Sequence, residues 1–457
     1  SLSSSNLSNN FNLSFQFLRV YILSLILFTC AASIPDVKAT NSDITVDDFR
    51  SHIGYLASDG LKGRMAGTIG DELAKDYIVN HFTNAGLPAK RAVEVQEHYV
   101  RPSRMSKEKV LTYNIIGILP GNDPILKDEY VVIGGHYDST KNPVLPINQV
   151  IREKIGVMFG NPESTSKNTF FDRIDRINNG ADDNASGTAM TLELFEKYAS
   201  LNNHKRTLVF ILFGGEELGL LGSKYYTDNP TIQLDKVQLM VNLDMIGRLD
   251  DEKNVYLGGV PTAKDLDKII DSFSVDSSLN VISYDHSVSG IQSLFSRSDH
   301  YNFYKNDIPS LFFFTGIHPD YHTPRDEIDK VNFDGLKLIS NLVDKVVDEA
   351  ANRSEKFEFK PLPAEATEQP PMKMEVTLGV MPDYSHDGKG LKIDSVIAKR
   401  PAKKAGMIDG DIVLKIQDTD IDDIYKYMEA LSKLKPGSKA KVIVLRNDEE
   451  IVLDVQF

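Results

Sequence analysis

The stretch YVVIGGHYDS, residues 130–139, carries the strongest indication of the fold. It begins as a continuous apolar run, and His136 and Asp138 follow directly after that run. A continuous apolar run is typical of a strand that is buried on both faces of a parallel sheet. Polar side chains at the carboxyl end of such a strand are typical of a ligand site. The stretch therefore predicts a buried strand that delivers two polar side chains to a site.

Apolar runs of the same kind recur along the chain and alternate with helical patterns. Further runs with strand character lie at 114–119, 207–213, 239–243 and 310–314. Helical periodicity covers 68–86, 186–201, 262–273 and 333–351. This alternation predicts an α/β fold, in which a mostly parallel central sheet is flanked by helices on both faces. Residues 139–180 are a long polar insertion in this scheme, and such a loop is typical of a lid or a substrate wall.

Four more polar clusters stand at the ends of these predicted elements. They are GADDNASG at 180–187, FGGEELG at 213–219, NLDM at 242–245 and YHTPRD at 321–326. Any one of them alone would be typical of a turn, a helix start or an N-cap. Five in series at strand and helix ends instead favour a shared site, because the carboxyl ends of parallel strands meet at one edge. Histidine and carboxylate suit zinc or another divalent ion, and about five ligands suit two metals that share a carboxylate.

In this order the five segments resemble the family of co-catalytic two-zinc aminopeptidases that includes bacterial leucyl aminopeptidase. Glutaminyl cyclases and glutamate carboxypeptidases are relatives of that family, and the resemblance covers about residues 45–352. It implies that His136 and Asp244 bind one zinc ion and that Glu217 and His322 bind the other. It also implies that Asp183 bridges the two Zn²⁺ ions.

The resemblance implies catalytic roles as well. Glu216 would be the general base toward a water shared by the two zinc ions, and Asp138 would accept the second N–H of His136. The peptide bond between Asp183 and Asn184 would be cis.

Some members of the family supply a tyrosine for the oxyanion shortly before a Ser-Asp-His motif, which here is Ser298–His300, but residues 294–297 hold no tyrosine. Tyr301, Tyr321 and Arg297 are the candidates to replace it. His300 and His318 are expected in the site wall rather than as ligands.

The sequence therefore predicts a metallo-aminopeptidase that hydrolyses the N-terminal residues of peptides or proteins. Two alternatives remain open. The same two-zinc site could serve a carboxypeptidase, with Arg297 or Arg325 holding the substrate carboxylate, or a glutaminyl cyclase. The chain could also be a non-enzymatic adaptor that acts through its C-terminal residues, 374–457. The complete ligand set and the presence of Glu216 argue against the cyclase and the adaptor.

Residues 1–39 have the character of a signal peptide. An apolar run over 20–32 follows Arg19 and is shorter than the roughly 20 residues of a membrane helix. Residues 37–39, VKA, resemble a cleavage site, so the sequence predicts a secreted or periplasmic protein. A lipoprotein signal at Cys30, the only cysteine, is the alternative, and only this lipidation would place the protein at a membrane. The net charge of -14 argues against a nucleic-acid partner.

The composition changes after the predicted zinc peptidase domain, residues 40–353. Residues 354–373 contain four prolines and predict a semi-rigid linker. Residues 374–457 resemble the PDZ domains attached to secreted bacterial proteases, above all in the stretch AGMIDGDIV at 405–413. The resemblance implies a small α+β domain that binds extended chain ends by strand addition, with its carboxylate loop near 378–380. A structural appendage with a degenerate groove is the alternative, because the loop lacks a clean Gly-Leu-Gly-Phe.

Overall fold

The computed structural model describes most of the chain after residue 40. The described residues are 41–86, 90–102, 106–140, 177–275, 277–283, 295–362, 376–382, 389–397, 399–422, 424–447 and 449–457. The predicted signal peptide, most of the insertion at 139–180 and the second half of the predicted linker lie outside them. None of the helices in the described part is long and apolar enough to cross a membrane.

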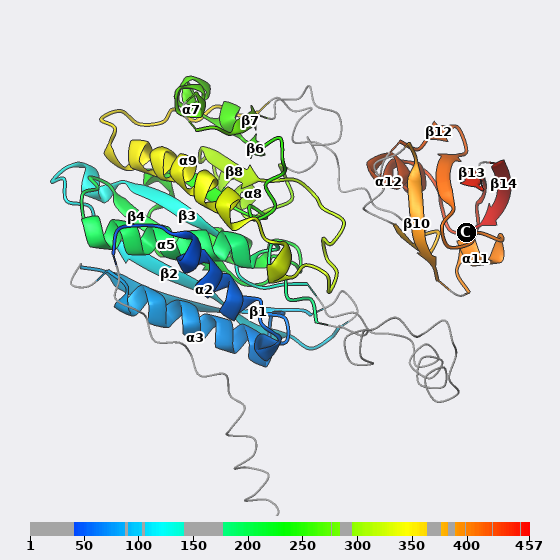
Figure 1. Ribbon diagram of the computed structural model, residues 1–457, viewed down its shortest axis with the longest axis horizontal. Helices are drawn as coiled ribbons and strands as arrows, with labels where there is room; N and C mark the ends of the chain where they lie inside the picture. Colours follow the sequence, from blue (N-terminus) through cyan, green and yellow to red (C-terminus); the bar gives the residue numbers. More distant parts are fainter. Residues whose placement is uncertain are drawn as a thin grey trace, which may run out of the picture. The chain divides into compact units, whose positions relative to one another are not determined.

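The larger sheet has eight strands in the order β1-β2-β4-β3-β5-β8-β6-β7 (Figure 1). Its strands are β1 (Ala92–Val100), β2 (Val110–Leu119), β3 (Tyr130–His136), β4 (Thr207–Phe213), β5 (Val237–Leu243), β6 (Asn254–Gly258), β7 (Asn280–Ser283) and β8 (Ser310–Phe314). The four central strands β4, β3, β5 and β8 are parallel. β2 joins β4, and β6 joins β8, in antiparallel pairing. The α/β prediction is confirmed, and the parallel centre turns four carboxyl ends to one edge.

Helices cover both faces of this sheet. They are α2 (Val46–Leu56), α3 (Ile69–Asn84), α5 (Ala185–Leu201), α6 (Leu221–Asp228), α7 (Leu266–Ser274), α8 (His300–Tyr304) and α9 (Phe333–Asn352). α3, α5 and α9 pack on one face, where Phe195 of α5 lies 5.4 Å, between ring centroids, from Phe210 of β4. α6 and α8 supply Tyr226 and Phe303 to an apolar cluster with β4 and β5 on the other. The strands β3, β4 and β5 are buried almost throughout, as their continuous apolar runs predict.

The first part of the predicted linker is attached to the peptidase domain. Lys264 N donates to Glu358 O at 3.0 Å, and Lys360 N donates to Thr262 O at 2.8 Å. Leu362 N donates to the Tyr304 hydroxyl at the end of α8, at 3.0 Å. Residues 357–362 are therefore an ordered extension of the larger domain, a feature that the proline-rich composition did not predict.

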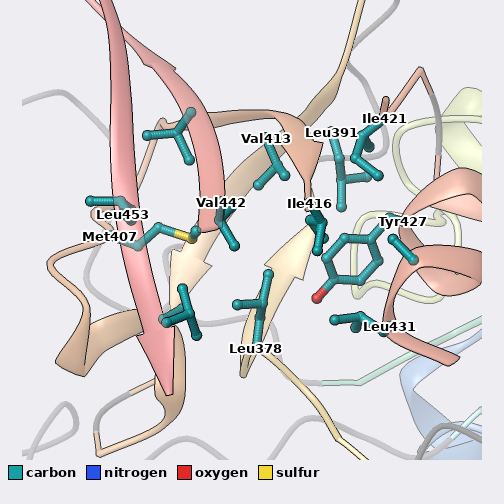
Figure 2. Packing of buried hydrophobic residues seen from close by; sticks show 14 of the residues in the cluster. Leu378, Leu391, Met407, Val413, Ile416, Ile421, Tyr427, Leu431, Val442 and Leu453 are labelled. Atoms are coloured by element: carbon teal, nitrogen blue, oxygen red, sulfur yellow. The ribbon is translucent and has the colours of Figure 1, made fainter. Parts of the chain in front are cut away.

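Residues 376–457 form a second, smaller sheet of antiparallel strands in the order β14-β13-β11-β10-β9, with β12 paired to β11. The elements are β9 (Val380–Pro382), β10 (Leu391–Val396), α11 (Pro401–Lys404), β11 (Ile412–Ile416), β12 (Thr419–Asp420), α12 (Ile424–Ser432), β13 (Lys439–Arg446) and β14 (Glu449–Gln456). Figure 2 shows its own apolar core, in which Tyr427 and Leu431 of α12 face Leu378 and Ile416. The predicted α+β domain is confirmed.

Candidate metal centre

All five predicted ligands meet at the carboxyl edge of the parallel strands. His136 ends β3, Asp244 follows β5, and Glu217 lies in the turn after β4. His322 comes from the loop after β8, and Asp183 lies just before α5. The potential ligand atoms form two groups, and the atoms of each group lie within 4.8 Å of one another. One group consists of His136, Glu216 and Asp244, and the other consists of Asp183, Glu217 and His322.

Asp183 joins the two groups. Its Oδ1 lies 3.3 Å from His136 Nε2, and its Oδ2 lies 3.1 Å from His322 Nε2. His136 Nε2 is also 3.3 Å from Asp244 Oδ1, and His322 Nε2 is 3.2 Å from Glu217 Oε2. One carboxylate thus presents one oxygen to each half of the site, which is the arrangement that a bridging ligand requires.

The charge balance of the site fits divalent cations. Burial alone would lower the pKa of His322, but Glu217 and Asp183 outweigh burial and raise this pKa to about 11. Burial and Asp183 raise the pKa of Glu217 to about 7. Glu217 Oε1 is buried and has no hydrogen-bond partner among the described residues. Imidazole and carboxylate are zinc ligands, and a cation would satisfy the open oxygen and the crowded negative charge together.

The general-base candidate, Glu216, lies in the same group as His136 and Asp244. Its Oε2 is 4.0 Å from His136 Nε2. Burial raises the pKa of Glu216 well above its ordinary range; His136 opposes this rise, and Glu217 and Asp299 add to it. A carboxylate in such surroundings holds a proton more strongly than a solvated one, as a general base near neutral pH must.

Asp138 positions both the first histidine and the base. His136 Nδ1 lies 3.1 Å from the Asp138 carbonyl oxygen, whereas the nearer Asp138 carboxylate oxygen is 3.7 Å away. The backbone carbonyl is therefore the nearer acceptor, where the resemblance implies the carboxylate. That carboxylate instead accepts the backbone N–H groups of Glu216 at 3.1 Å and Glu217 at 3.4 Å.

Three residues without a predicted role hold ligands in place. The Asp326 carboxylate accepts the N–H of Asp183 at 2.9 Å, and Ser298 Oγ donates to Asp244 Oδ2 at 2.7 Å. Asn184 Nδ2 donates to the carbonyls of His136 and Leu243, at 3.2 and 3.0 Å. The Asp183–Asn184 peptide is cis, as the resemblance implies. Asp326 and Ser298 lie inside motifs that the sequence singles out, but their contacts depend on folding.

Tyr321 is the tyrosine that the fold brings to the ligands. Its ring stacks on that of His322, with centroids 3.7 Å apart. Burial, Asp183 and Glu217 raise the pKa of Tyr321 well above its ordinary value, so its hydroxyl keeps its proton. Tyr301 stacks on Tyr304 instead. His300 and His318 lie outside both ligand groups. His300 stacks on Phe312, and His318 Nε2 is 3.2 Å from Asp182 Oδ2.

Of the two arginines considered for a substrate carboxylate, Arg325 is already engaged. Its Nε donates to Asp320 Oδ1 at 3.1 Å, and its Nη2 donates to the Pro319 carbonyl at 3.1 Å. Arg248 and Lys330 contact the same carboxylate, at 2.7 and 3.0 Å. These three cations, opposed by burial, lower the pKa of Asp320 to about 2. Arg297 is exposed.

Comparisons with known proteins identify the family of each of the two domains. Residues 114–347 match the model of peptidase family M28, and residues 376–457 match the model of the PDZ domain. Aminopeptidase YwaD of Bacillus subtilis is 32% identical over 197 residues, which are 39% of this chain and 39% of YwaD. Leupeptin-inactivating enzyme 1 of Streptomyces exfoliatus is 28% identical over 253 residues, 51% of this chain and 46% of that enzyme. The match thus spans less than half the length of these curated relatives.

Solved structures share the fold. The zinc aminopeptidase BSAP of Bacillus subtilis superimposes with a TM-score of 0.51 at 18% identity, over 71% of this chain and 100% of BSAP. A glutaminyl cyclase of Porphyromonas gingivalis reaches a TM-score of 0.50 at 18% identity, over 68% of this chain and 99% of the cyclase. Because both enzymes share the fold, the choice between their reactions depends on the site.

Proposed function

The chain belongs to peptidase family M28 and carries a PDZ domain over residues 376–457; from this premise we propose that it is a zinc-dependent aminopeptidase. The observation that carries the proposal is the position of Asp183, which faces His136 with one oxygen and His322 with the other. This pairing supports two zinc ions, with His136 and Asp244 on one, Glu217 and His322 on the other and Asp183 between them. When bound, the ions would lower the pKa of an attacking water and polarise the scissile carbonyl.

Glu216 supplies the proton transfers in this proposal. Its carboxylate accepts the proton of the attacking water and then delivers it to the leaving amine, so that the amine departs neutral. Asp138 fixes the position of Glu216 through the Glu216 backbone N–H, at 3.1 Å. Tyr321 keeps its proton and donates a hydrogen bond to the oxyanion that develops on the substrate carbonyl.

Two features favour an aminopeptidase over the alternatives. A carboxypeptidase needs a cation that is free to bind the substrate carboxylate. Of the two candidates, Arg325 is held by Asp320 and by the Pro319 carbonyl, which leaves Arg297 alone for this role. A cyclase typically needs one zinc ion and no hydrolytic water, whereas this chain brings together a second ligand group and Glu216. The peptidase site keeps all of these residues, which also argues against a non-enzymatic adaptor.

We propose further that the protein is exported and acts on the N-termini of peptides or proteins outside the cytoplasm. The signal-like segment 1–39 and the single cysteine, Cys30, support export without disulfides. Lipidation of Cys30 would instead anchor the protein to a membrane. The PDZ domain is proposed to bind an extended peptide at its sheet edge.

The experiment that tests the activity uses the chain from residue 40 onward and paired substrates. Leucine p-nitroanilide and its N-acetyl form differ only in the free α-amine. The aminopeptidase proposal expects hydrolysis of the first and a rate at least about a hundredfold lower for the second. Acetyl-Leu-Gly with a free carboxylate tests the carboxypeptidase, and an N-terminal glutaminyl peptide tests the cyclase. Preference for either of the last two substrates would overturn the proposal.

A further inference from the structure

A fully buried arginine, Arg64, lies behind the metal centre in the connection between α2 and α3. Its guanidinium donates to four backbone carbonyls. Nε donates to Tyr137 O at 2.8 Å, and Nη2 donates to Gly180 O at 3.0 Å. Nη1 donates to Leu56 O at 2.5 Å and to Asn179 O at 2.6 Å. Because carbonyls belong to the backbone, these bonds fix the path of the chain rather than the rotamer of a side chain.

The segments that Arg64 joins are those that carry ligands. Tyr137 stands between His136 and Asp138, and Gly180 opens the turn that leads to Asp183. These segments are also the two stems of the insertion at 139–180. The stems touch directly as well, since Ser139 Oγ donates to Asn178 O at 2.9 Å and Ser139 N donates to Arg64 O at 3.4 Å.

The positive charge of Arg64 also fits its position beside the carboxylates of the metal centre. Burial lowers its pKa to about 10, and Asp138 and Asp183 oppose that fall, so the guanidinium stays charged at neutral pH. A buried cation costs free energy unless its surroundings stabilise it. Four carbonyls and the nearby carboxylates provide that stabilisation, and only the planar fork of arginine can reach carbonyls on three separate segments at once.

We propose that Arg64 is a positioning residue of the metal centre, which clasps both stems of the insertion and so holds His136 and Asp183 at the separation that zinc binding requires. The proposal rests on the proposed zinc site, but its test does not depend on peptidase activity. Arg64 touches neither ligand side chain; it acts through the backbone on either side of them.

The chain contains a matched control in Arg206. This arginine is equally buried and also donates to backbone carbonyls, those of Ala350 at 3.0 Å and Arg353 at 2.6 Å. Arg206 precedes β4, whereas Glu216 and Glu217 follow that strand, so it lies at the opposite edge of the sheet. Its Nε also donates to Glu129 Oε2 at 2.8 Å. Arg206→Lys therefore reports the cost of losing a buried guanidinium and its partners at a place remote from the ligands.

The experiment compares Arg64→Lys, Arg206→Lys and the unchanged chain. Zinc affinity is measured by competition with a chromogenic chelator, and the unfolding temperature is measured without metal. Lysine keeps the charge but loses the fork, so we expect Arg64→Lys to weaken zinc binding by about 10–100-fold, as outer partners of metal ligands do. The absorption of the cobalt-substituted protein should change as well, because ligand geometry changes. Arg206→Lys should lower the unfolding temperature and leave zinc affinity unchanged.

The proposal would be overturned if the unfolding temperature fell equally in both variants and Arg64→Lys kept its zinc affinity. Arg64 would then be an ordinary structural residue. If Arg64→Lys does not fold, Ser139→Ala replaces it, because it removes one clasp between the same stems and should weaken zinc binding in the same direction. Unchanged affinity in that variant would also overturn the proposal. A chain that binds zinc but cleaves nothing would refute the proposed activity and leave this test intact.

Discussion

Replacing Glu216 by glutamine separates proton transfer from metal binding. The amide has the size of the carboxylate and leaves His136, Asp183, Glu217, Asp244 and His322 in place. It cannot accept the proton of the attacking water, so kcat should fall by about 10²–10⁴-fold, the usual contribution of a positioned base. At about 1.36 kcal/mol for each factor of ten, this is roughly 2.7–5.4 kcal/mol of barrier. The KM should change little, because the metal ligands remain.

The same substitution has a second effect that can be measured without metal. The pKa of Glu216 is raised in the folded protein, chiefly by burial. The folded state therefore holds this proton more strongly than the unfolded chain, and stability falls as the pH rises above the ordinary glutamate value of about 4.3. Glu216→Gln removes this loss. The metal-free variant should unfold at a higher temperature than the unchanged protein at pH 8, and the two should converge near pH 4.

The assay combines leucine p-nitroanilide hydrolysis with zinc analysis of the same samples. Glu193→Gln is the matched control, because Glu193 is also buried and its Oε1 pairs with His52 Nε2 at 2.8 Å in a cluster apart from the ligands. The control should keep its kcat. A Glu216→Gln enzyme with normal zinc content and a kcat within threefold or so of the unchanged enzyme would remove Glu216 from the mechanism, because a lost base costs at least about a hundredfold.

Three further predictions concern other parts of the molecule. Tyr321→Phe should lower kcat by about 10²-fold with unchanged zinc content, as the loss of an oxyanion donor does, and an unchanged kcat would exclude the hydroxyl. A chain that ends at Leu362 should cleave leucine p-nitroanilide like the full chain. A chain that ends at Ser354 should unfold at a lower temperature than the one that ends at Leu362, because it lacks the 357–362 extension. Equal unfolding temperatures of the two shortened chains would contradict this. Zinc binding at pH 7 should release protons, because metal-free His322, with its pKa raised to about 11, must lose one, and Glu217, with its pKa raised to about 7, must lose part of another. Calorimetry in buffers of different ionisation enthalpy measures this release, and a value of zero would contradict the assignment of His322.

The sequence predicts the centre of the fold and the ligands because both have strong local signals. Runs such as 130–134 and 208–213 are continuously apolar, which is typical of a strand buried on both faces. His136 ends such a run, and Glu217 and Asp244 follow one within a few residues, whereas Asp183 precedes a helix and His322 lies eight residues after β8. Strands β1, β6 and β7 are missed because they are short or half-exposed, and their patterns lack continuous apolar character.

What the sequence does not reveal is the layer of contacts behind the ligands. Arg64 stands 119 positions before Asp183 in the chain, and nothing local in the sequence connects the two. Asp138 shows the same limit at shorter range. Its place beside His136 is evident from the motif, but the choice between its carbonyl and its carboxylate is made by the turn after β4, whose N–H groups attract the carboxylate. Such choices depend on tertiary packing.

The number of zinc ions bound by the unchanged chain and by Asp183→Ala tests the two-metal site itself. Both proteins are stripped of metal, reloaded with zinc, passed through a desalting column and analysed for metal per chain, with circular dichroism to confirm folding. A two-metal site predicts two equivalents of zinc for the unchanged chain. It also predicts loss of both from Asp183→Ala, because each half of the site uses one oxygen of this carboxylate. A folded Asp183→Ala chain that keeps two equivalents, or an unchanged chain that binds only one, would contradict it.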